Sequence, residues 1–181
     1  REYLGNLIIA DEIKEDAKKT VEELNNLGIK NVVMLTGDNR KIGENVASKL
    51  NISKVFIDLL ALGKVEKTEE FLKNKSANGK VLFVGDGIND APVLARADIG
   101  VAMGGVGSDA AIEAADMIVM NDEPSKIVTA LKIAKKTKKI VWQNIIFALG
   151  VKIIILGMGA LGFATMWEAV FGDVGVALIA I

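Results

Sequence analysis

The sequence predicts an α/β fold, in which a parallel sheet carries helices on both faces, followed by two transmembrane α-helices. Short apolar runs alternate with amphipathic segments through residues 1–124, which is typical of strands joined by crossover helices. A lysine-rich stretch then precedes roughly twenty apolar residues, enough to cross a bilayer. We therefore expect an α/β domain over residues 1–124, a linking helix over 125–142 and two membrane helices over 143–181, the second truncated.

The first half of the α/β domain contains strands expected over residues 7–10, 32–35 and 55–57. Apolar residues recur at helical spacing between Ile13 and Leu27, which predicts an amphipathic helix there. Gly28 is suited to end this helix because glycine adopts a left-handed backbone at low cost. A further helix is expected over residues 40–50.

The second half of the domain contains three more short apolar runs, the pattern of strands buried on both faces of a parallel sheet. These strands are expected over residues 81–84, 99–103 and 117–120. The expected helices cover residues 64–75, a short segment ending near 95, and a segment from 109 onward.

The membrane part begins with six lysines on the expected linking helix, between residues 126 and 139. Residues 145–166 are almost wholly apolar, interrupted by Lys152 and Thr165. Cations directly before an apolar span mark its cytoplasmic side, so residues 1–142 are expected in the cytoplasm. We expect the membrane itself to be the plasma (inner) membrane. The second apolar stretch, over residues 169–181, contains Asp173.

Composition bounds the chemistry of these 181 residues, of which 51% are hydrophobic. The net charge of −1 argues against a nucleic-acid partner. The absence of cysteine excludes disulfides and thiolate metal sites, and the absence of histidine removes the commonest transition-metal ligand. The chain begins without methionine and ends inside an apolar run, so we expect it to be cut from a longer polypeptide.

The strand expected over residues 81–84 runs into Gly85-Asp86-Gly87-Ile88-Asn89-Asp90-Ala91-Pro92. Asp90 is a good helix N-cap, and Pro92 is tolerated in a first helical turn. Asp86 and Asp90 then share a loop at the carboxyl edge of the sheet, where open α/β folds bind ligands. Two carboxylates without histidine or cysteine suit Mg²⁺, and we expect both to hold this ion.

A second turn, Thr36-Gly37-Asp38-Asn39, also follows a strand. The Thr36 hydroxyl and the adjacent amides are therefore expected at the same sheet edge as Asp86, one strand away. Amides grouped in such a turn favour anions, and a phosphoryl group is the anion that would accompany Mg²⁺.

The run from Gly85 to Pro92 resembles the hinge motif of P-type ATPases, whose phosphorylation domain belongs to the Rossmann-like, haloacid-dehalogenase-like superfamily. The resemblance extends over three later segments. These are Ala97-Asp98-Ile99-Gly100-Val101-Ala102-Met103-Gly104, Gly107-Ser108-Asp109-Ala110-Ala111 and Glu113-Ala114-Ala115-Asp116. It implies that residues 1–124 are the C-terminal part of a phosphorylation domain that uses ATP and Mg²⁺.

The resemblance also implies roles for individual residues. Thr36, Gly37 and Asp38 match the family's motif at the phosphate and nucleotide side, and Asn89 and Asp90 complete the polar network of the loop. Lys64 matches a lysine that neutralises phosphoryl oxygens. The family's usual context is Leu-Pro-any-Asp-Lys, whereas Leu60-Ala61-Leu62-Gly63-Lys64 lacks the proline and the acid.

The nucleophilic aspartate of the family, in Asp-Lys-Thr-Gly-Thr, does not occur in this sequence. We therefore expect the chain alone to be inactive. The expected partners are membrane lipid and the remainder of the same polypeptide, namely its nucleotide-binding, actuator and other transmembrane parts.

Within the family, zinc-, cadmium- and lead-transporting members carry a lysine in one membrane helix and Asp-any-Gly in the next, which Lys152 and Asp173-Val174-Gly175 match. The resemblance implies that Asp173 is a ligand of the transported Zn²⁺, Cd²⁺ or Pb²⁺ and that Lys152 is a counter-cation. The implied function is ATP-driven export through an aspartyl phosphate. The alternatives are a copper-transporting member, or a phosphatase-like domain on a membrane anchor.

Overall fold

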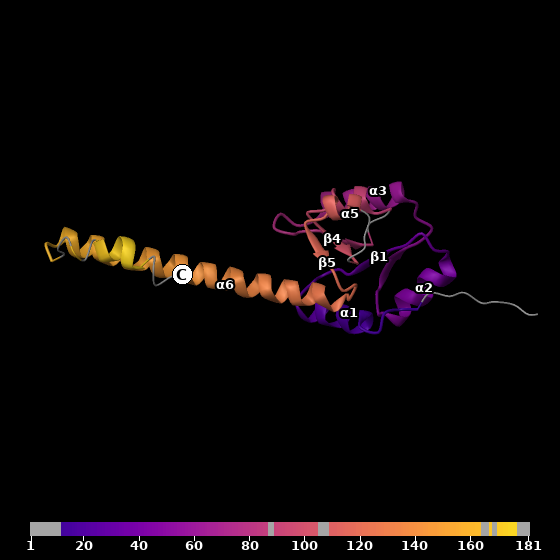
Figure 1. The fold of residues 1–181 in the computed structure, drawn as a ribbon, viewed down its shortest axis with the longest axis horizontal. Helices are drawn as coiled ribbons and strands as arrows, with labels where there is room; N and C mark the ends of the chain where they lie inside the picture. Colours follow the sequence, from indigo (N-terminus) through magenta and orange to yellow (C-terminus); the bar gives the residue numbers. More distant parts are fainter. Residues whose placement is uncertain (1–11, 87–88, 105–108, 164–166, 168–169, 177–181) are drawn as a thin grey trace, which may run out of the picture. The chain divides into compact units, whose positions relative to one another are not determined.

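The computed structural model describes residues 12–86, 89–104, 109–163, 167 and 170–176 (Figure 1). The chain divides into two compact units, Arg1–Thr129 and Ala130–Ile181. The strand expected over residues 7–10 and the motif residues Gly87 and Ile88 lie outside the described residues.

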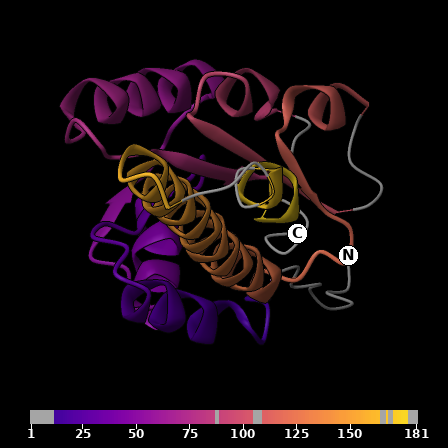
Figure 2. The ribbon, with the colours of Figure 1, turned by 90° about the vertical axis from the view of Figure 1, so that its left-hand side faces the viewer.

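The first unit alternates strands and helices as the sequence predicts, and every strand pair is parallel. Its elements are α1 (Ala17–Asn26), β1 (Val33–Leu35), α2 (Arg40–Lys49), β2 (Lys54–Phe56), α3 (Ala61–Asn74), β3 (Leu82–Gly85), α4 (Ala91–Leu94), β4 (Ile99–Met103), α5 (Asp109–Ala114) and β5 (Met117–Val119). Figure 2 shows α3, α4 and α5 along one side of the strands and α1 and α2 on the other. The predicted α/β layering is therefore confirmed.

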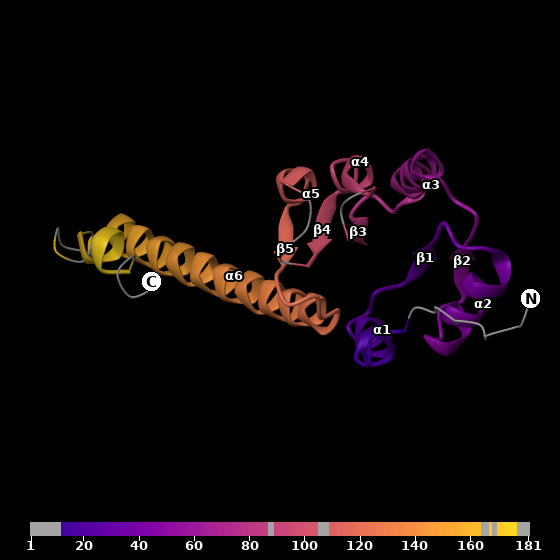
Figure 3. The same ribbon diagram turned by 45° about the vertical axis from the view of Figure 1, so that its right-hand side comes forward.

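Among the described residues, the parallel strands fall into two sheets. β1 pairs with β2, and β3, β4 and β5 pair in that order (Figure 3). The register sets Leu35 opposite Phe56 and Gly85 opposite Ala102. Strands pair only when they approach to about 4.8 Å, and a pattern of apolar runs does not say which strands come that close. One edge of β1 and one of β3 have no partner among the described strands.

The core of the first unit lies between α4 and β4, where Val93, Leu94, Val101 and Ala102 are buried. Gly100 permits this packing because an added Cβ would lie 2.6 Å from the backbone oxygen of Leu94. The short helix α4, which directly follows the Asp86–Asp90 loop, is thereby fixed against the sheet.

Helix α1 begins at Ala17, four residues later than the helical spacing from Ile13 indicates. The preceding residues instead bind the segment that leads into α6 (Ser125–Ala160). Asp16 Oδ2 accepts a hydrogen bond from the Ser125 backbone N–H at 2.8 Å, and Lys14 Nζ lies 2.5 Å from Asp122 Oδ1. Asp16 thus caps the N-terminus of α6 from a distant part of the sequence. At the other end of α1, Gly28 has φ +85° and ends the helix as predicted.

Asp98, directly before β4, holds the connection between α3 and β3. Its carboxylate accepts two 2.6 Å hydrogen bonds from Lys75 Nζ and one of 2.8 Å from the Val81 backbone N–H. The hydrogen bond from Lys75, followed by that from Val81, lowers the pKa of Asp98 from 3.8 to about 2. Ionised Asp98 therefore stabilises the fold above its ordinary pKa, and this contribution is lost as the pH falls toward about 2.

We expect the Asp98→Asn variant to lose less stability than the unchanged chain between about pH 5 and about pH 2.5, because it lacks this titrating carboxylate. Thermal unfolding of both proteins across this range measures the difference. Glu22→Gln, at an exposed position of α1, is the matched control and should keep the pH dependence of the unchanged chain. Parallel pH profiles for Asp98→Asn and the unchanged chain would contradict the expectation.

Helix α6 runs without interruption for 36 residues, so the predicted linking helix and first membrane helix are one element. Its first turns bury Ile127 and Val128 in the first unit, while most later side chains are exposed. Among the described residues it is the one helix long and apolar enough to span a membrane, with a mean hydropathy of 1.9 over its window.

Candidate functional site

The loop after β3 carries Asp86, Asn89 and Asp90, and the structure gives them different environments. Asp86 and Asn89 are exposed to solvent, whereas Asp90 is 6% exposed. An exposed carboxylate at the carboxyl end of a parallel strand is open to a ligand, while a buried one needs a partner inside the protein.

Asp90 has that partner in Lys64, whose Nζ lies 2.7 Å from Asp90 Oδ1. The Lys64 and Asp90 side chains are 18% and 9% exposed, so this charge-assisted hydrogen bond is largely shielded from water. The Thr68 hydroxyl donates a 2.9 Å hydrogen bond to the Lys64 backbone oxygen one turn later. The structure therefore brings together two site residues that the sequence placed 26 positions apart.

The predicted capping role of Asp90 is only half right. Asp90 occupies the N-cap position of α4, but its side chain makes no capping hydrogen bond. Its carboxylate is held by Lys64 and packs on the end of β3, where a Cβ added to Gly85 would lie 2.7 Å from Asp90 Oδ2. An ion pair with the partly buried Lys64 outweighs a single backbone N–H as the partner of the carboxylate.

Lys64 lies in the first turn of α3, which begins at Ala61 rather than at Lys64 as the sequence pattern indicates. The first helical hydrogen bond runs from the Lys64 N–H to the Leu60 oxygen at 3.1 Å. The backbone of Leu60 is extended, with φ −72° and ψ 168°, which is the conformation required of a residue before proline. Position 61 is thus compatible with proline although the chain has alanine there.

We expect Ala61→Pro to stabilise the domain by about 0.4–1 kcal/mol, because proline restricts the unfolded chain and fits a first helical position. A higher thermal midpoint for the variant is the measurement. Val65→Pro, one turn later, is the control and should cost about 3 kcal/mol, because it removes an interior helical hydrogen bond. An unchanged or lower midpoint for Ala61→Pro would show that the loop before Lys64 does not accept the family's residue.

The Thr36 turn is tied to the chain that leads into α3. The Thr36 backbone oxygen accepts a 3.0 Å hydrogen bond from the Leu59 N–H, and the Asp38 oxygen accepts one of 3.0 Å from the Asp58 N–H. Gly37 approaches closely, since an added Cβ would lie 3.2 Å from the Leu59 oxygen. The residue that joins the Thr36 turn to the Lys64 helix is therefore Leu59, which the sequence pattern did not single out.

The Thr36 hydroxyl is engaged within its own turn. It donates to Asp38 Oδ2 at 2.7 Å and accepts from the Asp38 N–H at 3.1 Å. Asn39 caps α2 by accepting a 3.2 Å hydrogen bond from the Ile42 N–H. The turn is thus ordered by local hydrogen bonds, with Gly37 and Asp38 exposed.

The donor set around Asp86 fits Mg²⁺ in part. Asp86 offers an exposed carboxylate, and Asp90 has one oxygen that is not paired with Lys64. No group of three acidic, histidine or cysteine side chains that could hold a metal occurs within the described ranges. Mg²⁺ commonly keeps several waters and one or two carboxylates, so the donor types of Asp86 and Asp90 suit this ion.

In the second unit, Lys152 lies on α6 and is exposed, and Asp173 lies in a π-helical turn, η1 (Phe171–Gly175). Gly172 packs against Ile155, because an added Cβ would lie 2.2 Å from Ile155 Cδ1. Ile155 is one turn from Lys152 along α6. Along the axis of α6, the backbone at Asp173 therefore lies about as far as Lys152 does. Turns of π-helix frequently occur at functional sites.

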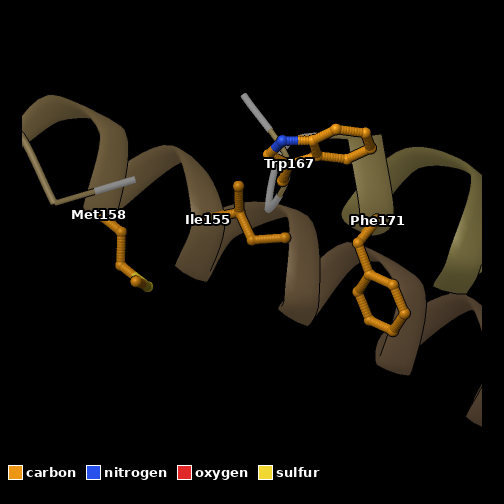
Figure 4. A pocket seen from close by; sticks show the side chains of 4 residues that line it. All are labelled: Ile155, Met158, Trp167 and Phe171. Carbon is orange, nitrogen blue, oxygen red and sulfur yellow. The ribbon is translucent and has the colours of Figure 1, made fainter. Parts of the chain in front are cut away.

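A glycine with a left-handed backbone follows the C-terminal end of α6. Helix α6 ends at Ala160, and Gly162 has φ +79°. Thr165 and Met166 lie outside the described residues. An apolar pocket of this unit is lined by Ile155, Met158, Trp167 and Phe171 (Figure 4), with no ionisable residue in its lining. It is separate in character from the acidic loop after β3.

The chain that carries this loop is similar to known proteins. The family model described as haloacid dehalogenase-like hydrolase matches residues 1–98. The chain therefore belongs to the haloacid dehalogenase-like hydrolase family.

More particular relatives cover almost the whole chain. It is 60% identical over 99% of its length to a cadmium, zinc and cobalt-transporting ATPase of Bacillus subtilis, and 52% identical over 99% to a zinc-transporting ATPase of Synechocystis. The crystal structure of a zinc-transporting PIB-type ATPase in the E2.Pi state is also similar, with 36% sequence identity and a TM-score of 0.84. The match covers 94% of the chain described here and 27% of the chain in that crystal structure. The chain spans about a quarter of the length of the two curated relatives, 26% and 25%.

Proposed function

We propose that this chain is the C-terminal part of a P-type ATPase that exports divalent heavy-metal cations. The observation that carries the proposal is the 60% identity to a cadmium, zinc and cobalt-transporting ATPase over 99% of the chain. That span includes the Asp86 loop, Lys64 and both ionisable residues of the apolar segments. ATP is the proposed phosphoryl donor, and Zn²⁺, Cd²⁺ and Pb²⁺ are the proposed transported ions.

In this proposal the residues of the first unit position a phosphoryl group and balance its charge. Lys64, held in place by Asp90, would face the phosphoryl oxygens. The Gly37 amide and the Thr36 hydroxyl would bind them from the neighbouring turn, with the hydroxyl exchanging its hydrogen bond to Asp38 for one to the phosphoryl group. Asp86, with Asp90 and Asn89 beside it, would hold Mg²⁺. The ion would supply electrostatic stabilisation of the charge that develops during phosphoryl transfer.

The nucleophilic aspartate must come from the remainder of the polypeptide. The two separate sheets suggest where its strand belongs, since β1 and β3 each have one edge that no described strand pairs. Thr36 follows β1 and Asp86 follows β3, so a parallel strand between them would end between these two groups. We therefore propose that the strand bearing Asp-Lys-Thr-Gly-Thr joins the sheets, and that residues 1–124 complete the phosphorylation domain with it.

For the membrane part, we propose that α6 and a second helix over the last apolar stretch form a pair within the plasma membrane, with residues 1–142 in the cytoplasm. The lysines before the apolar part of α6 support this orientation. Lys152 and Asp173 favour divalent zinc-type ions, because the copper-transporting alternative places other residues in these helices. The phosphatase-like alternative on a membrane anchor leaves these two ionisable residues without a role.

We expect the 181-residue chain alone not to hydrolyse ATP in the presence of Mg²⁺, because it contains no Asp-Lys-Thr-Gly-Thr nucleophile. Release of phosphate by the purified chain, compared with that by the whole polypeptide, is the measurement. Turnover by the chain alone that Asp86→Ala removes would show a complete site in these residues and would overturn the proposal.

A further inference from the structure

Four lysines of α6 fall on one face of the helix. They are spaced at i, i+3, i+4 and i+7, which places them within an arc of about 100°. The set, called here the lysine stripe, consists of Lys132, Lys135, Lys136 and Lys139. All four are exposed, and α6 contains no acidic residue in its 36 positions. The orientation of a membrane helix depends on how many cations flank it and not on which helix face carries them. The gathering of these lysines on one face therefore requires a separate explanation.

With α6 across a membrane, the lysine stripe would begin at the depth of the lipid headgroups and extend away from the bilayer. Trp142 is an aromatic of the kind found at membrane interfaces, and the apolar part of α6 follows it. At 1.5 Å per residue, Lys139 lies about 4.5 Å and Lys132 about 15 Å before Trp142 along the helix. The headgroup layer is about 5–8 Å thick on each side of the bilayer core.

The flexible stems of Lys135 and Lys136 extend the reach of their ammonium groups into that layer. Lys132 remains within about one Debye length, some 8 Å, of it. Three other lysines of α6, Lys126, Lys138 and Lys152, lie outside the stripe. Lys126 lies in the first turn, where it pairs with Glu123, and Lys138 points about 110° away from the centre of the stripe.

We propose that the lysine stripe is a binding site for anionic phospholipid headgroups at the cytoplasmic end of α6. This rests on the proposed function only in that α6 spans a membrane. Basic residues clustered directly on the cytoplasmic side of a span attract anionic lipid, and lysine binds phosphate as a compact charge. Because α6 is continuous, headgroups held at the stripe would also fix the depth of Lys152, thirteen residues further along the helix.

The test uses the whole polypeptide in vesicles of phosphatidylcholine that contain spin-labelled phosphatidylglycerol or spin-labelled phosphatidylcholine. We expect the protein to select the anionic lipid by about three- to fivefold, and the variant with all four stripe lysines changed to Gln to lose most of this selectivity. This measurement of lipid selectivity needs neither ATP nor metal, so it remains valid if the proposed transport function fails.

Two controls keep the outcome decisive. Changing Lys18, Lys19, Lys41 and Lys49 of α1 and α2 to Gln removes the same charge elsewhere and should leave selectivity unchanged. Changing the four stripe lysines to Arg keeps their charge and should preserve the selectivity for anionic lipid. This variant still tests the stripe if the Gln variant does not insert into the membrane. Added inorganic phosphate at constant ionic strength should not compete, since the site takes a membrane-anchored headgroup. Unaltered selectivity in the Gln variant, or an equal loss in the control, overturns the proposal.

Discussion

Asp86→Asn in the whole polypeptide is expected to lower formation of the phosphorylated intermediate by at least about 100-fold. Asp86 is the exposed carboxylate of the loop after β3, and Mg²⁺ requires an anionic oxygen that an amide does not supply. Acid-stable labelling with ATP that carries phosphorus-32 in its γ-phosphate is the measurement. Normal labelling of Asp86→Asn would remove Asp86 from the proposed Mg²⁺ site.

Two further variants separate the roles within the loop. Asp90→Asn should also reduce labelling, but through Lys64, because it removes the anion that lies 2.7 Å from Lys64 Nζ. Thermal stability distinguishes Asp90→Asn from Asp86→Asn. Breaking the largely buried pair of Asp90 and Lys64 is destabilising, whereas changing the exposed Asp86 is not. Asp58→Asn is the matched control, because Asp58 is exposed and has φ +54°, a conformation that asparagine tolerates. It should label normally.

Asp173→Ala is expected to abolish stimulation of ATP hydrolysis by Zn²⁺ and to reduce the amount of bound metal. An ionisable residue in the middle of a membrane helix costs about 2.5–3.5 kcal/mol, so such residues usually carry function. The backbone of Asp173 lies in the π-helical turn η1, and Gly172 packs against Ile155 of α6. Carboxylate oxygen suits Zn²⁺, and the remaining ligands would come from other helices.

The same measurements on Lys152→Ala test the proposed counter-cation. That variant should bind metal but lose the coupling between metal and hydrolysis, because the role proposed for Lys152 is that of a counter-cation and not of a ligand. Val174→Ala, next to Asp173 and exposed, is the control and should retain stimulation. Comparison of Zn²⁺, Cd²⁺ and Pb²⁺ identifies which ion the site prefers. Full stimulation and unchanged metal content in Asp173→Ala would refute the ligand role.

The sequence pattern placed the candidate site residues correctly at the ends of strands. Asp86 follows β3 and Thr36 follows β1, as the apolar runs before them predict. It did not predict the connections between these segments. Leu59, which ties the Thr36 turn to the start of α3, is one apolar residue among several and carries no local signal.

By itself, the sequence determined the order of strands and helices, their parallel connections and the long apolar helix. Each of these depends on periodic burial within a few residues, which the spacing of apolar side chains records. Only the tertiary structure decided that α1 begins at Ala17, since Asp16 is used to cap Ser125, 109 positions away. It likewise decided that Asp90 pairs with Lys64 instead of capping α4. A carboxylate binds the strongest donor that folding brings near, and that donor is fixed by distances in space rather than along the chain.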